Sequence, residues 1–414
     1  SLVDRINIDV LYAVEGPRTF RDHDHAQLCE KIKEVAIKYG NDIRRLCVFE
    51  RALRREAAII RKELEIEGIY PDQLEMLIAL KTMKMKGLRN GLNSISKIFL
   101  RQCSMMQSHS EDCIKKAKTQ LGGFPVFIKP ARPGNKCVHS YSVASNPEEM
   151  RAWIKVLKLM NYRSDYVFEE YLSNGHEFTA VCSKTGLIGS IATMDQSRTL
   201  YECVKNKKPY AVEYLNVEQC RNCLPGIESF VNKAIKSLDL RHFAKNLLFI
   251  KGFYKAHNLI SFISASFEPR SETDYRLLQE ANNSVSWEVL DFFAPKFPDR
   301  YFMVINFPKV EGVLLHQTNI PRKEADIRVA WRVSEGEELY DCDSVDDNIL
   351  QVNFKQFLRR KDNRRVLASE VAQIMDTTQI TVDRACIFEE SSTCNQPYNH
   401  VANHSCDSQC TNVE

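Results

Sequence analysis

The sequence predicts an α+β fold, because short apolar runs of strand length alternate with segments that carry the start and stop signals of helices. The alternation is clearest between residues 122 and 186. Apolar strands are expected there at residues 126–128, 166–168 and 177–182. Asn146 can cap a helix between the first two strands, with Pro147 in its first position and Glu149 three residues after the cap. Gly186 closes the third strand with a turn that favours positive φ.

Four regions are expected along the 414 residues, enough chain for two or three packed units. Residues 1–80 form a partial α/β region, with a strand at 6–14 and helices at 26–39 and 42–66. Residues 81–300 form a core, with a helix at 227–240 and a hairpin of strands at 247–254 and 259–267, whereas 195–226 shows no clear period. Residues 301–380 are β-rich, with turns at Gly312 and Gly336 and a short helix at 366–375. Residues 381–414 form a polar tail that is expected to be disordered, and residues 391–414 are expected to be dispensable for folding.

Composition excludes several classes of function. Hydrophobic residues make up 44% and charged residues 27%, as in an ordinary globular protein. The net charge of +3 offers no electrostatic reason to expect nucleic acid or a membrane surface as partner. There is no apolar run of 18 residues for a transmembrane helix, and the first residues lack the layout of a signal peptide. The 14 cysteines are scattered, which favours thiols in a reducing compartment, the cytoplasm.

Charged residues at the strand ends indicate a possible nucleotide site. Lys129 ends a buried strand, where a lysine can hold a phosphate as a point charge. The backbone from Glu170 to Leu172 leaves the next strand and can read an adenine edge. Glu177 follows, and its carboxylate can accept hydrogen bonds from ribose hydroxyls. The alternative for each residue taken alone is an ordinary sheet with charged surface positions.

Taken together, this order of elements resembles the ATP-grasp superfamily. It runs strand–Lys–Pro, loop, helix, strand–Glu-Glu-Tyr-Leu, turn, Glu-Phe-Thr. The resemblance implies two α/β subdomains that clasp a nucleotide, with ATP as cofactor. It places Lys129 on the phosphates, Glu169 and the backbone of Glu170 and Leu172 at the adenine, and Glu177 at the ribose. The chain looks most similar to the amino-acid and dipeptide ligases, of the carnosine-synthase and D-alanine–D-alanine ligase types.

Relatives also carry a second lysine that reaches the ATP phosphates, at the start of a helix that ends in glycine. Lys81, ten residues before Gly91, is the candidate, although the acid usual before that lysine is Leu80 here. Lys84 and Lys86 compete for the role, and a plain surface lysine is the alternative.

The resemblance weakens at the metal. Relatives end a late strand with Glu-Ile-Asn-Pro-Arg, whose Glu and Asn hold Mg²⁺ with an acid from the preceding strand. Here Ser266 and Glu268 occupy those two positions, and no Asp or Glu occurs from 240 to 267. Because Mg²⁺ prefers carboxylate oxygens, we expect Glu268 to hold it weakly or not at all. Arg270 keeps the position that faces the acyl phosphate, unless it and Glu268 are a surface ion pair.

The phosphate-covering loop also departs from the family. Residues 131–139 contain one glycine, Gly134, and Pro133 lacks an N–H donor. Arg132 and Lys136 can supply charge in place of the missing backbone donors.

The lineage therefore implies an ATP-dependent carboxylate–amine ligase that forms an acyl phosphate, with an amino acid or small carboxylate as partner and with weak or no activity. The competing interpretation is a catalytically silent descendant that binds nucleotide or a protein; a third is an interaction module unrelated to ATP. Lys129, Glu177 and the 170–172 backbone are expected to face one cleft.

Two groups of cysteines remain outside this site. Cys220 and Cys223 form a lone CxxC pair and are expected to be structural thiols. The tail carries a second group, which is expected to lie in flexible chain, with a zinc site as the alternative: Cys394, His400, His404, Cys406 and Cys410.

Overall fold

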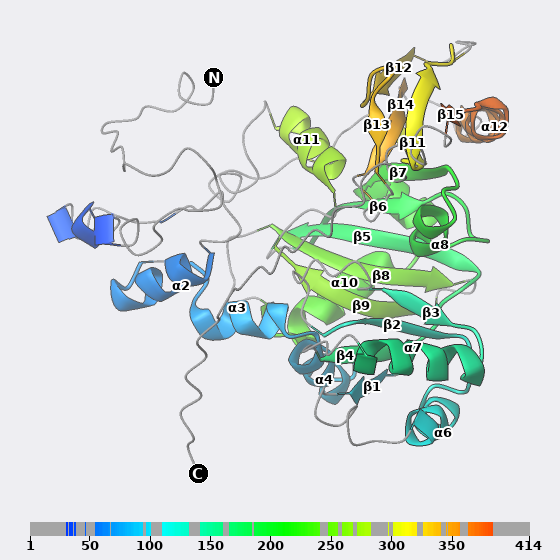
Figure 1. The fold of residues 1–414 in the computed structure, drawn as a ribbon. Helices are drawn as coiled ribbons and strands as arrows, with labels where there is room; N and C mark the ends of the chain where they lie inside the picture. The colour runs from blue at the N-terminus through cyan, green and yellow to red at the C-terminus, as the bar shows by residue number, and fades with distance from the viewer. Residues whose placement is uncertain are drawn as a thin grey trace, which may run out of the picture.

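The fold is taken from a computed structural model (Figure 1). It describes residues 54–66, 68–93, 97–100, 110–131, 141–159, 165–183, 186–240, 247–255, 259–267, 271–282, 301–320, 326–340, 347–356 and 363–383, with scattered residues between 30 and 46 and residues 297 and 345. The strand expected at 6–14, the loop 132–139 and the tail from 384 onward lie outside this range, and so do Glu268 and Arg270.

A small sheet lies at one end of the molecule, below the larger sheet in Figure 1. Its antiparallel strands run in the order β1 (Lys97–Leu100), β4 (Tyr166–Glu170), β2 (Val126–Pro130) and β3 (Ser142–Ala144). Helices α6 (Ser110–Gln120) and α7 (Pro147–Leu159) share a buried apolar cluster with this sheet. Ile128 and Phe168 are opposite each other in the register and both belong to that cluster, so one face of the sheet packs on the helices.

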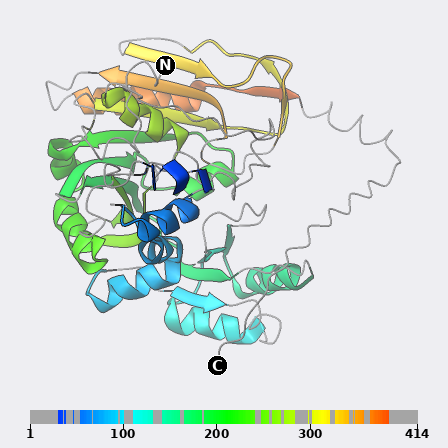
Figure 2. The same ribbon diagram turned by 90° about the vertical axis from the view of Figure 1, so that its left-hand side faces the viewer.

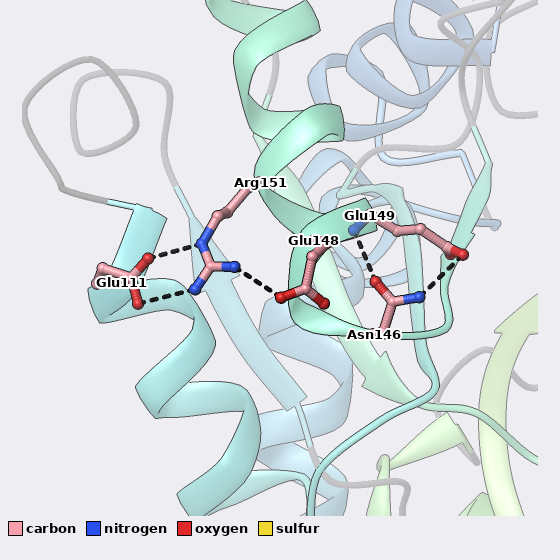
Figure 3. A network of polar contacts seen from close by, with 5 residues as sticks. All are labelled: Glu111, Asn146, Glu148, Glu149 and Arg151. Carbon is pink, nitrogen blue, oxygen red and sulfur yellow. Dashed lines mark hydrogen bonds and ion pairs between the residues drawn. The ribbon is translucent and has the colours of Figure 1, made fainter.

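Helix α7 starts where the sequence predicts. The Glu149 backbone N–H donates to Asn146 Oδ1 at 2.9 Å, and the Ser145 N–H donates to Glu149 Oε2 at 2.7 Å. Arg151, one turn further on, joins Glu111 of α6 to Glu148 of α7 (Figure 3). The capping contacts satisfy backbone donors that the first helical turn leaves without intrahelical partners.

The large sheet has eight antiparallel strands and forms the body of the protein. In spatial order they are β12 (Asp326–Trp331), β14 (Asn348–Gln356), β10 (Tyr301–Pro308), β7 (Tyr210–Asn216), β6 (Gly186–Thr193), β5 (Gly175–Ser183), β8 (Leu248–Lys255) and β9 (Ile260–Ser266). Both the strand at 177–182 and the hairpin at 247–267 are confirmed. Gly186 has the expected positive φ, +128°.

The two faces of the large sheet bury different clusters. Phe178 and Phe262 belong to the main core, together with residues of α10 (Ile227–Ser237), the helix expected at 227–240. Val181 and Phe249 belong to a second cluster, which includes residues of α8 (Leu200–Lys205) and α11 (Glu272–Ala281). The main core packs so closely that a Cβ on Gly252 would lie 2.3 Å from the Phe178 ring.

The third sheet covers one end of the large one, at the top of Figures 1 and 2. It pairs β13 (Glu338–Leu339), β11 (Gly312–His316) and β15 (Thr381–Asp383). Helix α12 (Asn363–Thr377) accompanies it and is longer than the expected 366–375, while Gly312 and Gly336 have the positive φ expected of their turns.

One expectation for the helices was wrong. The helix expected over 42–66 is not continuous: α2 spans Arg54–Glu63, and Leu46 is non-helical. The Leu46 carbonyl instead accepts hydrogen bonds from the Arg61 guanidinium, a tertiary contact that helical periodicity cannot anticipate. Helices α3 (Pro71–Ile78) and α4 (Leu80–Arg89) follow, the latter ending before Gly91 as predicted.

Residues 195–226, in which the sequence shows no clear period, nevertheless form regular elements. They include α8, β7 and α9 (Val217–Cys223), and each helix begins with a capping box, at Thr199 and Asn216. Each cap is followed three residues later by Glu202 or Gln219, a signal that was present in the sequence. The elements are too short to show a clear period. In the part of the chain that the structure describes, no helix is long and apolar enough to cross a membrane.

Candidate functional site

Two lysines and one glutamate meet inside the protein, on the face of the small sheet that turns away from α6 and α7. Lys129 on β2 and Glu169 on β4 lie on this face, because their neighbours Ile128 and Phe168 point into the helix-covered cluster. Lys129 Nζ is 2.8 Å from Glu169 Oε2. Lys84 of α4 pairs with the other carboxylate oxygen, Oε1, and all three side chains are buried. We call Lys84, Lys129 and Glu169 the lysine–glutamate cluster.

Two lysines share one carboxylate in this cluster. Burial alone would raise the pKa of the Glu169 carboxyl, but the charges of Lys129 and Lys84 outweigh burial and lower it. Glu169 is therefore ionised, and one carboxylate faces two lysines. Each ammonium group has three N–H donors, so a lysine that is paired with Glu169 can also donate to an anionic ligand.

Lys84 was the competitor of Lys81 in the sequence, and it is the lysine that the structure brings to Glu169. The Lys81 side chain is outside the described part of the structure, so its assignment to the phosphates stays a prediction. Leu80, Met83, Lys84 and Gly87 are all buried and recur with helical spacing along α4. That stripe was visible in the sequence and indicates that Lys84 points inward.

Helix α8 links Glu177 to the face that carries the cluster. The Leu200 backbone N–H donates to Glu177 Oε1 at 2.9 Å. The next residue, Tyr201, packs its ring edge-on against Phe127 of β2, with centroids 5.2 Å apart. Phe127 is opposite Glu169 in the register and shares its face of the sheet. The same helix thus contacts both halves of the predicted nucleotide site.

An apolar cluster lies next to Glu177. Leu172 is buried against Phe253, with Ile263 packed alongside. Phe253 is the register partner of Glu177, so the two side chains are on the same face of the large sheet. Glu170, at the end of β4, is partly exposed, and its carboxylate lies 3.9 Å from Lys255 Nζ. A buried apolar cluster and the Glu177 carboxylate therefore lie side by side on this face of the large sheet.

The described residues of β8 and β9 include no Asp or Glu. On β8, the face that carries Phe253 also carries Phe249 and Lys251, and Ser266 of β9 is opposite Phe249. Among the residues that the structure describes, no group of three or more His, Cys, Asp or Glu side chains can hold a metal ion. The described part of these two strands therefore offers none of the carboxylates that Mg²⁺ prefers, while Glu268 lies outside it. Lys251, which sequence reasoning missed, instead places a cation on this face.

No protein-family model and no curated protein sequence matches the chain. Solved structures do resemble it. An L-amino acid ligase from Bacillus licheniformis superposes with a TM-score of 0.58 at 11% identity, over 85% of this chain and 84% of the ligase chain. The biotin carboxylase domain of Hydrogenobacter thermophilus 2-oxoglutarate carboxylase, solved with MgADP, ADP and bicarbonate, gives 0.51 at 16%, over 86% and 78%. The chain therefore has the ATP-grasp fold, as its sequence predicts.

Proposed function

We propose that the protein binds a nucleotide, ATP, and descends from carboxylate–amine ligases that form an acyl phosphate, with weak or no ligase activity of its own. The observation that carries this proposal is the lysine–glutamate cluster, a buried group in which two lysines share one carboxylate on the inner face of the small sheet. The fold supports it, since both similar structures are ATP-grasp enzymes.

In this proposal each residue has a binding role. Lys84 and Lys129 hold the phosphates by charge-assisted hydrogen bonds, and Glu169 keeps the two ammonium groups in place until the nucleotide arrives. Leu172 and Phe253 offer an apolar surface to the adenine ring, and Glu177 lies where the ribose hydroxyls would be. Lys81 is a further phosphate ligand, and the Glu170 backbone reads the adenine edge.

Weak catalysis follows from the missing metal ligands. Transfer of a phosphoryl group to a carboxylate brings anions together, and metal ions normally neutralise the developing charge. On this face of β8 and β9 the described residues are Phe249, Lys251, Phe253 and Ser266, and none of them has a carboxylate to hold that metal. Lys251 and Arg270 can offset part of the charge, so nucleotide affinity should depend little on Mg²⁺. Glu268 is the one acid left for a weak metal contact.

The proposal is tested by titrating ATP calorimetrically into the native protein and into Lys84→Met. Loss of a hydrogen bond to a charged group costs about 1.5–3 kcal/mol, which corresponds to a rise in Kd of roughly 10- to 100-fold. The matched control is Lys86→Met on the same helix, because Lys86 pairs at 3.7 Å with the exposed Asp239. Its Kd should equal that of the native protein. An unchanged affinity in a folded Lys84→Met would remove the cluster from the nucleotide site.

The alternative, a silent descendant, is separated from a weak ligase by ADP release across a panel of amino acids and small carboxylates. The carboxylate-free face of β8 favours low turnover with or without Mg²⁺. Robust Mg²⁺-dependent ADP formation by the native protein would contradict this and would mean that Glu268 or another acid completes a metal site.

A further inference from the structure

Three consecutive residues at the beginning of α8 each contact a different part of the proposed nucleotide site. They are Thr199, Leu200 and Tyr201, and we call them the α8 start. The helix is anchored on the large sheet, because Leu200 and Cys203 belong to the buried cluster that contains Val181 of β5. The α8 start is therefore fixed to the body of the protein at the point where it meets the site.

Thr199 contacts the segment 170–172, the proposed reader of the adenine edge. The hydroxyl of Tyr171, which directly follows the end of β4, lies 3.1 Å from Thr199 Oγ1, within hydrogen-bond distance. Burial raises the pKa of the Tyr171 hydroxyl, so it stays protonated at neutral pH and can donate. Thr199 is itself buried and caps the helix, because the Glu202 backbone N–H donates to its Oγ1 at 3.2 Å. One hydroxyl thus serves both the helix cap and the adenine segment.

Leu200 holds the carboxylate that is proposed for the ribose. Its backbone N–H donates to Glu177 Oε1 at 2.9 Å. The Glu177 backbone N–H in turn donates to Thr193 Oγ1 at 3.0 Å, so both the main chain and the side chain of Glu177 are held. An ionised carboxylate can accept several hydrogen bonds on its two oxygens. The contact with Leu200 therefore orients the Glu177 carboxylate and leaves it able to accept further donors.

Tyr201 connects the helix to the small sheet. Its ring meets Phe127 of β2 edge-on, with centroids 5.2 Å apart, and Phe127 stacks on Tyr141 at 6.2 Å. Edge-on and offset-stacked rings are the arrangements that aromatic pairs prefer. Phe127 lies on the same face of β2 as Lys129, two residues further along the strand. The contact of Tyr201 therefore fixes the sheet that carries Lys129 relative to the body of the protein.

We propose that the α8 start positions the nucleotide site, with Thr199 as the positioning residue. It holds the 170–172 segment, Glu177 and the small sheet in place relative to one another, and it does so without contacting the nucleotide. Because the three contacts come from consecutive residues of one short helix, a shift at the cap displaces all of them together. The inference rests on the proposed function, since it concerns the site defined there.

The test is calorimetric titration of ATP into the native protein and into Thr199→Ala, which loses both the cap and the contact with Tyr171. The Kd should rise about fivefold, the change that the loss of one helix cap corresponds to, and Thr199→Ser should restore it. The matched control is Asn216→Ala, which removes the same kind of capping box from α9 and should leave the Kd unchanged. Tyr171→Phe added to Thr199→Ala should weaken binding no further, because both substitutions remove the same contact.

A second measurement needs no nucleotide. Hydrogen exchange of the segment 166–178, followed by peptide mass spectrometry, should be faster in nucleotide-free Thr199→Ala than in the native protein, because Tyr171 and Glu177 lie in this segment. Asn216→Ala should exchange there like the native protein. The inference is overturned if Thr199→Ala binds ATP or exchanges like the native protein, or if Asn216→Ala has the same effects. A native protein that binds no ATP would refute the proposed function, and the exchange measurement would still decide whether the α8 start holds these segments.

Discussion

Replacement of Glu169 by glutamine should destabilise the small sheet far more than replacement of either lysine in the same cluster. Glu169→Gln removes the carboxylate that both buried ammonium groups share, whereas Lys129→Met leaves the Lys84–Glu169 ion pair in place. Removing one partner of a buried ion pair costs about 3–5 kcal/mol. A volume-conserving apolar replacement usually costs less than about 1.5 kcal/mol, so Lys129→Met should fall in that range.

The assay is native-state hydrogen exchange of the β2 and β4 amides, which lie on the strands that carry Lys129 and Glu169. At neutral pH we expect the free energy of opening to fall by about 3 kcal/mol or more in Glu169→Gln, and by about 1.5 kcal/mol or less in Lys129→Met. Equal losses in the two variants, or a loss in Glu169→Gln below about 1 kcal/mol, would refute the charge-balance reasoning.

The pH dependence gives a second readout of the same residue. The folded-state pKa of Glu169 is lowered, so its stabilisation is present above the unfolded carboxyl pKa of about 4.3 and is lost as pH falls through the lower folded value. The difference in the free energy of opening between the native protein and Glu169→Gln should therefore be constant near neutral pH and shrink below about pH 4. A difference that persists unchanged at pH 3 would contradict this sign.

Two further predictions concern stability and thiol reactivity. Asn146→Ala should lower the free energy of unfolding, measured in urea, by about 1 kcal/mol, because the Glu149 N–H loses its capping acceptor. The control Arg151→Ala removes an exposed ion pair and should match the native protein. Equal losses of stability in the two variants would show that the cap is not the cause. Among the described cysteines, Cys223 should react first with iodoacetamide at pH 8, as followed by peptide mass spectrometry, because burial raises the pKa of Cys203 and Cys220 to about 12. Faster labelling at Cys203 or Cys220 would mean that these thiols are exposed in solution.

Much of the fold was predictable because its signals are local. The cap at Asn146 and the hairpin at 247–267 depend on residues within a few positions of one another, and both are confirmed. The elements between 195 and 226 are too short for periodicity, yet their capping boxes are equally local and could have been found. The non-helical backbone at Leu46 accepts hydrogen bonds from Arg61, 15 positions away, and helical periodicity cannot predict such a contact.

The candidate site likewise has residues that the sequence predicts and residues that only the structure identifies. Lys129, Glu169 and Glu177 stand out in the sequence because each lies in or next to an apolar strand, and strand alternation fixes the face that each occupies. Which lysine completes the cluster was open between Lys81, Lys84 and Lys86, since all three lie on one helix. The structure brings Lys84 to Glu169.

The sequence by itself therefore determined the strands at 126–128, 166–168 and 177–182, the hairpin at 247–267, the start of α7 and the order of charged strand ends, because each depends on backbone geometry and neighbouring side chains. Only the tertiary structure decided which charges meet. Lys84 and Glu169 are 85 positions apart. Such contacts depend on how whole elements pack across buried apolar faces, and short-range patterns carry no information on the distance between them.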